Sequence, residues 1–175
     1  DVQVTMYDQL GSWYSDQPDF TKQENVDKFL KMDYFVDEIE EVRQKLGIDD
    51  FYLIGQSWGG AITQEYALKY PKHLKGIIIS SMTDNIAEYI VNINKIREHE
   101  YSKEDLDFMK ECENSGDYDN ERYQKLIDKL NCGYVDRKQP PAISHLTSTV
   151  ATSVYNYFQG DNEFVITGKL KDWHF

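Results

Sequence analysis

An apolar run, a glycine-rich turn and a helix follow one another without interruption between residues 51 and 70. The run from Phe51 to Ile54 has the length and the apolar character of a buried strand. After the stretch from Gly55 to Gly60, a helix runs to about Tyr70, where Pro71 stops it. A buried strand that passes directly into a helix is typical of folds in which parallel strands alternate with helices.

The segments on either side of this unit continue the alternation. Residues 2–7 are rich in β-formers and predict a strand, which the turn formers of residues 8–12 end. From about Val26, apolar residues recur at spacings of three and four and predict an amphipathic helix that ends at Gly47. These apolar positions are Phe29, Met32, Phe35, Val36, Ile39, Val42 and Leu46. Residues 74–79 predict a further strand.

The order strand, helix, strand, helix, strand predicts an α/β fold, with a parallel sheet that carries helices on both faces. We assign residues 1–82 to this core. From residue 84 to 131 the sequence shows helical periods only, with breaks near Gly116 and Gly133. We predict an inserted helical cap over residues 83–168 that forms a lid, and a return to the core over residues 169–175. Alternatively, these helices pack beside the sheet as ordinary layers.

The formal net charge of −12 disfavours two classes of partner. Such a surface repels nucleic acid and anionic lipid, and no cluster of Lys and Arg interrupts it. No apolar run approaches the ~20 residues that span a bilayer. Because the chain begins at Asp1 without Met and enters a strand at once, we expect an internal fragment that has lost any upstream targeting segment. Its localisation is open, with the cytoplasm favoured. The sequence does not indicate an oligomeric state. Cys112 and Cys132 lack metal-binding spacing and are expected to be free thiols.

Residues 55–59 match the pattern G-x-S-x-G, and their flanking elements supply the context of a nucleophile elbow. In such a turn Ser57 is strained, and the residues two before and two after it must be glycines because side chains would collide. The Ser57 hydroxyl would be the nucleophile, and the Trp58 backbone N–H would face a developing oxyanion. Gly60 is expected to allow close helix packing. In the alternative interpretation the glycines only make a tight turn, and Ser57 caps the helix.

A catalytic serine needs a histidine base and a carboxylate that orients it, in the chain order serine, acid, histidine. None of the four histidines follows a predicted core strand, so we expect surface or structural roles for all of them. They are His73, His99, His145 and His174. The glycine-rich loop that should precede the first strand is absent as well. These absences predict that the rest of the triad lies outside this sequence.

Several short motifs resemble, in the right order, those of proline iminopeptidases. They are Tyr7-Asp8-Gln9-Leu10-Gly11, Ser15-Asp16, Gly55-Gln56-Ser57-Trp58-Gly59-Gly60, Asn162-Glu163-Phe164, Thr167-Gly168 and Lys171-Asp172-Trp173. The likeness covers nearly the whole chain, and the tryptophan after the serine together with the late block makes it specific. In that family the glycine-rich loop lies upstream of the strand predicted for residues 2–7, and the triad aspartate and histidine lie downstream of Trp173.

The resemblance implies that the serine attacks the carbonyl after an N-terminal residue, often proline, while acidic lid residues hold the free amine. It implies that Glu163 binds this amine and that Tyr155 assists, although Tyr157 is close by. A carboxylate suits this role, because its ion pair with an amine is stronger in a partly dry pocket than in water. Residues 11–15 and 136–148 depart from the pattern of relatives, which leaves the preference for proline open.

We therefore predict a serine aminopeptidase that releases N-terminal proline, or another small or apolar residue, from short peptides or amino-acid amides. The reaction would pass through an acyl-enzyme on Ser57, without a metal or an organic cofactor. Residues 1–175 alone should be inactive, because a triad serine without its base loses orders of magnitude in rate. The alternatives are another α/β-hydrolase (an esterase, an amino-acid amidase or an epoxide hydrolase) and a non-catalytic binding protein of the same fold.

Overall fold

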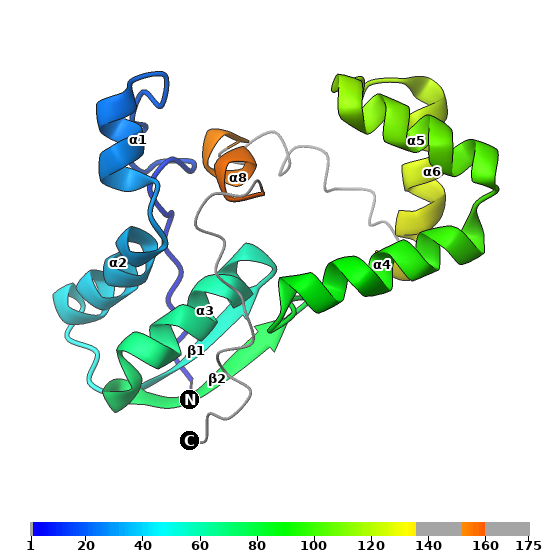
Figure 1. Cartoon of the computed structure of the whole chain (residues 1–175). Coiled ribbons are helices and arrows are strands. Elements are labelled where there is room, and N and C mark those ends of the chain that lie inside the picture. The colour runs from blue at the N-terminus through cyan, green and yellow to red at the C-terminus, as the bar shows by residue number, and fades with distance from the viewer. Residues whose placement is uncertain (1, 136–151, 160–175) are drawn as a thin grey trace. The chain divides into compact units, whose positions relative to one another are not determined.

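The computed structural model describes residues 2–135 and 152–159 (Figure 1). The chain divides into two compact units, one formed by residues 1–86 with 146–175 and the other by residues 87–145. Helix α8 (Thr152–Gln159) falls within the segment assigned to the cap, and its side chains pack in the core of the first unit. The assignment of residues 83–168 to a cap over a site stays a prediction.

Two parallel strands form the sheet of the first unit. β1 (Phe51–Gln56) pairs with β2 (Leu74–Ser80), and the register runs from Tyr52 opposite Gly76 to Gln56 opposite Ser80. Helix α3 (Trp58–Lys69) and the short 3₁₀ helix η1 (Pro71–His73) connect the strands. The predicted order of strand, helix and strand is confirmed here, because an apolar run, a glycine turn and a proline stop are all local signals.

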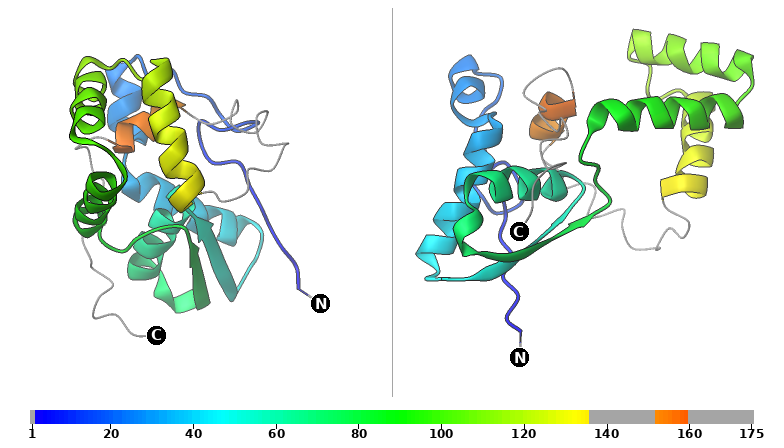
Figure 2. Two further views of the ribbon diagram at one scale, coloured as in Figure 1. Left: turned by 90° about the vertical axis from the view of Figure 1, so that its right-hand side faces the viewer. Right: turned by 60° about the horizontal axis from the view of Figure 1, so that its bottom comes forward.

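One face of this sheet is covered by α3 (Figure 2). On the other face Tyr52, Ile54 and Ile78 are more than half exposed, so within the described residues the sheet carries helices on one face only. The α/β class of the fold does not depend on this second face, since it rests on the parallel strands and their helical connection.

The strand predicted for residues 2–7 is wrong for the described chain. These residues are extended but pair with no described strand, and Val2, Val4 and Met6 are largely exposed. A strand is held by hydrogen bonds to a neighbouring strand, and within residues 2–135 and 152–159 the sheet consists of β1 and β2 alone. Local β-propensity therefore makes the segment extended without supplying its partner.

The helix predicted from Val26 to Leu46 is two helices. α1 (Gln23–Phe29) and α2 (Met32–Lys45) are separated by Leu30 and Lys31, and Lys31 is extended with φ −129° and ψ 140°. The break allows Leu30 and Met32, which are two positions apart, both to be buried. The predicted end is confirmed, because Gly47 has φ 65° and its N–H donates to the Gln44 carbonyl.

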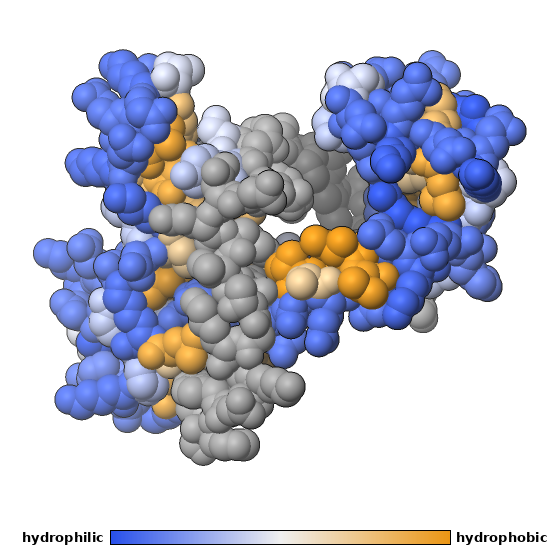
Figure 3. Space-filling model, viewed as in Figure 1, coloured by the Kyte–Doolittle hydropathy of each residue, from blue (hydrophilic) through white to orange (hydrophobic). Residues whose placement is uncertain are grey.

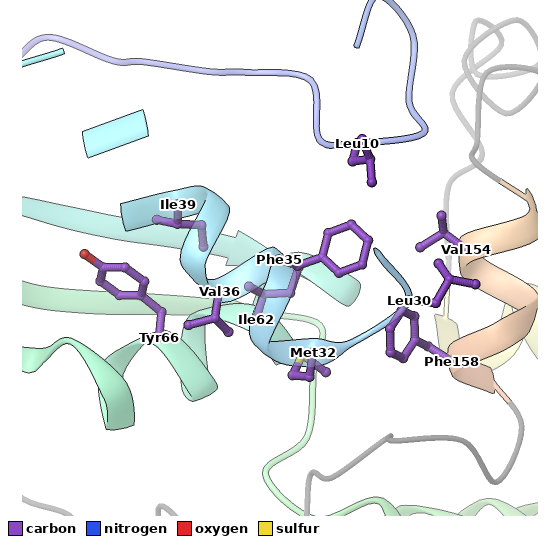
Figure 4. Close-up of a cluster of buried hydrophobic side chains, with 10 residues drawn as sticks. All are labelled: Leu10, Leu30, Met32, Phe35, Val36, Ile39, Ile62, Tyr66, Val154 and Phe158. Atoms are coloured by element: carbon purple, nitrogen blue, oxygen red, sulfur yellow. The ribbon is translucent and has the colours of Figure 1, made fainter. Parts of the chain in front are cut away.

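The core of the first unit joins α2, α3, α8 and the loop near Leu10. Figure 4 shows α8 directing Val154 and Phe158 toward Leu30, which is 2 % exposed. The buried members are Leu10, Leu30, Met32, Phe35, Val36, Ile39, Ile62, Tyr66, Val154 and Phe158. β1, which leads to Ser57, and α3, which follows it, thus pack against the same apolar cluster.

The described part of the second unit consists of helices and the short connections between them. Its elements are α4 (Ile86–Glu100), α5 (Lys103–Ser115), α6 (Glu121–Leu130) and the π-helical turn η2 (Asn131–Val135). Its core contains Tyr101, Met109, Cys112, Tyr123 and Leu130. Gly116 ends α5 with φ 72°, as predicted, whereas Gly133 lies inside η2 and breaks nothing.

In the view of Figure 3, apolar side chains gather on the surface over α4. Ile90 and Val91 are about half exposed there, at 49 % and 53 %. None of the helices in the described ranges is both long and apolar enough to cross a membrane. Cys112 is a buried free thiol and Cys132 an exposed one, as predicted.

Candidate active site

Ser57 has a backbone conformation that side-chain-bearing residues seldom adopt. Its φ is 50° and its ψ is −119°, at the junction between β1 and α3. Its N–H donates to the Ser80 carbonyl at 2.9 Å, and its own carbonyl accepts from the N–H groups of Gly60 and Ala61 at 2.8 and 3.1 Å. The strained bend is therefore tied to the end of β2 on one side and to the first turn of α3 on the other.

The two glycines that flank Ser57 do not share the same steric role. A Cβ at Gly55 would lie 2.1 Å from the Gly59 carbonyl oxygen and 2.4 Å from the Thr63 hydroxyl. A Cβ at Gly59 would meet no atom within 4 Å in the described structure. The prediction that both flanking residues must be glycine is confirmed for Gly55 and wrong for Gly59, because the crowding is between the position-55 side chain and the helix backbone.

Gly60 provides the predicted close packing. A Cβ there would lie 2.8 Å from Met82 Cβ and 3.2 Å from Ile79 Cγ2. Nearby, the Gln64 side chain donates to the Thr83 carbonyl at 2.9 Å, which attaches the loop after β2 to α3. The carboxyl ends of both strands are thus held against the same helix.

The Ser57 side chain is exposed, and within the described chain its hydroxyl makes no capping hydrogen bond to α3. Ser57 occupies the N-cap position of α3, but the interpretation in which its side chain caps the helix is wrong. Trp58 is the first residue of α3, so its backbone N–H lies at the positive end of the helix dipole. An exposed hydroxyl beside this end of a helix is the arrangement that a nucleophile and a developing oxyanion require.

The indole of Trp58 contacts residues of the N-terminal loop, of α2 and of α8. Its Nε1–H donates to the Gln9 side-chain oxygen at 3.2 Å. Its ring meets Phe35 edge to face, with 5.6 Å between the ring centroids, and lies 4.8 Å from the Phe158 ring at an angle of 33°. The sequence predicts a role only for the Trp58 backbone, and the only signal for Gln9 is its place in a motif shared with relatives.

The loop that carries Gln9 is itself fixed to α2. The Leu10 N–H donates to Glu38 Oε1 at 3.0 Å, and Glu38 Oε2 is buried without a hydrogen-bond partner in the described structure. Burial raises the pKa of Glu38 above its ordinary value, and the charge of Glu41 adds to this effect. Burial, together with the charge of Glu38, also raises the pKa of Tyr7 strongly.

A charged network pins α2 to α3. The Tyr66 hydroxyl donates to Glu40 at 2.7 Å, and Glu40 also accepts from Arg43 at 2.7 and 2.9 Å and from Gln44 at 2.8 Å. These hydrogen bonds, the Arg43 bond first, lower the pKa of Glu40 to about 2 against the opposing effect of burial. Tyr66 is fully buried, so the helix that follows Ser57 is fixed by both packing and charge.

The two histidines in the described ranges give no sign of a base for Ser57. His73 immediately precedes β2, and Ser57 is bonded to the far end of that strand, which places the two roughly 20 Å apart. His99 lies on α4 in the second unit and contacts Glu100 at 3.2 Å. His145 and His174 lie outside the described residues. The described residues contain no group of three His, Cys, Asp or Glu suited to a metal ion.

The predicted substrate-binding residues lie beyond the described side chains. Glu163 is outside the described residues altogether. Tyr155 lies on α8, but its side chain is not among those described. Their roles stay predictions.

The chain is similar in sequence to proteins of known families. Residues 1–97 match a family model described as the alpha/beta hydrolase fold. The chain is 34 % identical to a proline iminopeptidase of Flavobacterium johnsoniae over 174 residues, which cover 95 % of this chain and 56 % of that protein. It is 36 % identical to a proline iminopeptidase of Elizabethkingia meningoseptica, with the same shares covered.

Solved structures agree. The crystal structure of VinJ matches with a TM-score of 0.73 and 25 % identity, covering 94 % of this chain and 56 % of that one. A proline iminopeptidase of Mycobacterium smegmatis matches with a TM-score of 0.64 and 25 % identity, covering 83 % and 50 %. The chain thus spans about half the length of the relatives it matches, at 56 % for both curated proteins. The predicted fold class and the predicted resemblance are confirmed.

Proposed function

Because the chain belongs to the alpha/beta hydrolase fold family, we propose that it supplies the nucleophile of a serine aminopeptidase of the proline iminopeptidase type. The observation that carries the proposal is the backbone of Ser57, with φ 50° at the end of β1 and directly before α3. Strained backbone of this kind clusters at active sites, and a turn of this kind suits a hydroxyl that must be accessible to a substrate. The substrates are short peptides or amino-acid amides with a free N-terminal amine, and nucleic acid and membranes are not partners.

The proposed reaction has two steps. The Ser57 oxygen attacks the carbonyl carbon after the first residue and passes its proton to a histidine, and the oxyanion that forms accepts a hydrogen bond from the Trp58 N–H. The C–N bond breaks, the leaving amine takes the proton, and water then releases the acyl group from Ser57. We assign the histidine and its carboxylate partner to residues outside the described ranges. No metal or organic cofactor takes part.

The proposal includes capture of the substrate amine by Glu163, assisted by Tyr155. The support is the likeness to relatives in the motif that contains Glu163, and the chemistry of the pair. A carboxylate and an ammonium group attract each other more strongly in a partly dry pocket than in water, so a single acidic residue can discriminate free from blocked N-termini.

The nucleophile is tested by Ser57→Ala in the complete protein, with prolyl p-nitroanilide as the substrate. We expect kcat to fall by at least about 10⁴-fold, because the acyl-enzyme can no longer form. A fluorophosphonate probe should label the unmodified protein on the tryptic peptide that contains Ser57. The matched control is Ser81→Ala, because Ser81 is exposed, follows β2 and also has a positive φ of 52°.

Three results would contradict this assignment. If Ser57→Ala hydrolysed the substrate at the wild-type rate, Ser57 would not be the nucleophile. Equal losses in the two serine variants would indicate a general effect on the strand ends. Failure of the probe to label any serine, together with tight binding of peptides, would favour a binding protein of this fold.

Amine capture is tested by Glu163→Gln in the complete protein. We expect kcat/KM to fall about 10- to 100-fold for prolyl p-nitroanilide, and much less for an ester whose amine is blocked, because only the first substrate carries the charge that Glu163 neutralises. Asp161→Asn, two residues away, is the control for a general loss of negative charge. Equal losses on both substrates would show that Glu163 does not bind the amine. They would favour an esterase or an amidase that does not select for a free amine.

A further inference from the structure

We infer that Gln9 is a positioning residue for this reaction, which acts by holding the indole of Trp58. The inference rests on the proposed function, because it concerns how the oxyanion-binding amide next to Ser57 is kept in place. It adds a residue that lies 49 positions away in the sequence and does not touch the reacting atoms.

The backbone of Trp58 must be rigid for this chemistry. An amide that stabilises an oxyanion is effective only if it is fixed before the charge develops. Trp58 follows a strained residue, and that strain favours any motion that relaxes the turn. A large side chain that is held firmly opposes such motion, because the indole is joined to its backbone through only two rotatable bonds.

Among the neighbours of the indole are two aromatic rings and one hydrogen-bond acceptor. Phe35 of α2 meets it edge to face, the ring of Phe158 of α8 is tilted by 33° against it, and Gln9 accepts its N–H. The two ring contacts resist translation but tolerate rotation of the indole in its plane. The hydrogen bond to Gln9 opposes this rotation, since it requires Nε1 to point at one oxygen.

Gln9 is itself anchored. Its carbonyl accepts the Ser12 N–H at 2.9 Å and the Ser12 hydroxyl at 2.6 Å. The next residue, Leu10, is buried and bonded through its N–H to Glu38 of α2. Gly11, with φ 83°, donates to the Asp16 carbonyl at 2.8 Å and closes the loop. The loop that carries Gln9 is therefore fixed to α2, and Gln9 holds the Trp58 indole from a fixed position.

The indole is also linked to α8. Phe158 is 2 % exposed and contacts both Trp58 and Phe35, with 5.8 Å between the ring centroids of Phe35 and Phe158. Figure 4 shows Phe158 and Val154 of α8 among the buried side chains of the core. Rotation of the Trp58 ring would disturb its contact with Phe158, and with it the packing of α8. Loss of the Gln9 bond is thus expected to affect kcat first, and KM to a smaller extent through α8.

The test is a double-mutant cycle on the complete protein with prolyl p-nitroanilide. Gln9→Leu removes the acceptor, Trp58→Phe removes the N–H while keeping a ring, and the third variant combines them. We expect Gln9→Leu to lower kcat about tenfold, below the 10²- to 10³-fold effect of deleting an oxyanion donor, with KM changed less than about threefold. The double variant should be no slower than the slower single variant. Effects that multiply would overturn the inference.

Two further variants separate positioning from a general structural effect. Gln9→Glu keeps an acceptor oxygen in the same place and should restore most of kcat. Gln17→Leu is the matched control, because Gln17 is an exposed glutamine of the same loop whose side chain donates only to the Trp13 and Ser15 carbonyls in the described structure. It should leave kcat unchanged. A loss in Gln17→Leu equal to that in Gln9→Leu would overturn the inference.

A readout independent of turnover distinguishes failure of this inference from failure of the proposed function. The Trp58 indole N–H signal in a ¹H–¹⁵N spectrum is identified by its absence in Trp58→Phe. In Gln9→Leu it should move and exchange with solvent at least about tenfold faster. An active protein in which Gln9→Leu alters neither kcat nor this signal overturns the positioning role alone. A wild-type protein that hydrolyses no amine-bearing substrate overturns the proposed function, and the positioning role with it.

Discussion

Ser57 and Ser102 both stand at the N-cap of a helix, α3 in the first unit and α5 in the second, and their backbones differ. Ser102 has φ −65° and ψ 158°, and its hydroxyl accepts the Asp105 N–H at 3.2 Å. Ser57 has φ 50° and ψ −119°, and its hydroxyl makes no capping bond in the described structure. One residue type at one helix position thus has two conformations and two sets of contacts.

The two serine hydroxyls differ in whether they are used to cap a helix. A capping hydroxyl satisfies a helix N–H and stabilises the helix by about 1 kcal/mol. A serine that makes no capping bond lacks that stabilisation, and the positive φ of Ser57 adds backbone strain of about 1–3 kcal/mol. The surroundings must offset this strain, and around Ser57 they do so through long-range contacts, whereas the cap at Ser102 is local.

The largest effect is expected from Gly55→Ala, which closes the space the Ser57 turn requires. The new Cβ would lie 2.1 Å from the Gly59 carbonyl oxygen, which is helix backbone and cannot rotate away. We expect the free energy of unfolding of the complete protein to fall by about 3 kcal/mol or more, with little hydrolytic activity in any folded fraction. Urea unfolding followed by far-UV circular dichroism measures the loss.

Gly59→Ala is the matched control for this prediction. Its Cβ would meet no atom within 4 Å in the described structure, and alanine is the better residue in a helix by about 1 kcal/mol. We expect unchanged or slightly raised stability and retained activity. If both alanine variants lose stability equally, the crowding around position 55 is not what shapes the turn.

The next largest effect is expected from Glu40→Gln, which weakens the support of α3. Glu40 joins Arg43 and Tyr66, and its pKa is lowered to about 2. We expect a loss of about 2 kcal/mol at pH 7, less than for a fully buried pair because the side chains of Arg43 and Glu40 are still 11 % and 12 % exposed. Since the pKa is lowered in the folded state, this contribution is complete above the ordinary value of 4.5 and is lost as the pH falls toward 2.

The measurement is the difference in unfolding free energy between wild type and Glu40→Gln at pH 7, 4.5 and 3. The difference should shrink across this range. Tyr66→Phe is the control, because it removes one hydrogen bond and leaves the charge, so its smaller loss of about 1 kcal/mol should depend little on pH. A difference for Glu40→Gln that stays constant down to pH 3 would show that its charge is not stabilised by the fold.

These contrasts also explain which features the sequence predicts. The unit from β1 through α3 to β2 is predictable because its signals are local: an apolar run, a glycine at position 55 and Pro71 after the helix. The strand predicted for residues 2–7 is wrong because local propensity cannot supply a pairing partner. The break at Lys31 escapes prediction because it depends on which apolar side chains share one core.

The candidate site divides in the same way. Its pattern and flanking elements predict Ser57, and the backbone there is strained as that pattern requires. The bond between Gln9 and Trp58 spans 49 positions and depends on the packing of two aromatic rings, so no periodicity or spacing encodes it. The space for a side chain at position 59 could not be predicted, because a sequence pattern gives the residue present and not the atoms that a side chain would contact.

The smallest effect is expected from Ser102→Ala, and it tests the comparison directly. Removing the cap leaves the Asp105 N–H without its side-chain acceptor and should lower the free energy of unfolding by about 1 kcal/mol, with no change in hydrolysis. Ser57→Ala should change that free energy by less than about 0.5 kcal/mol while abolishing hydrolysis, because no capping bond is lost. Ser102→Thr, which keeps a capping hydroxyl, should behave as wild type. If Ser57→Ala instead destabilises the protein as much as Ser102→Ala, then the Ser57 hydroxyl stabilises the fold after all, and the strained turn would have to be explained without reference to a nucleophile.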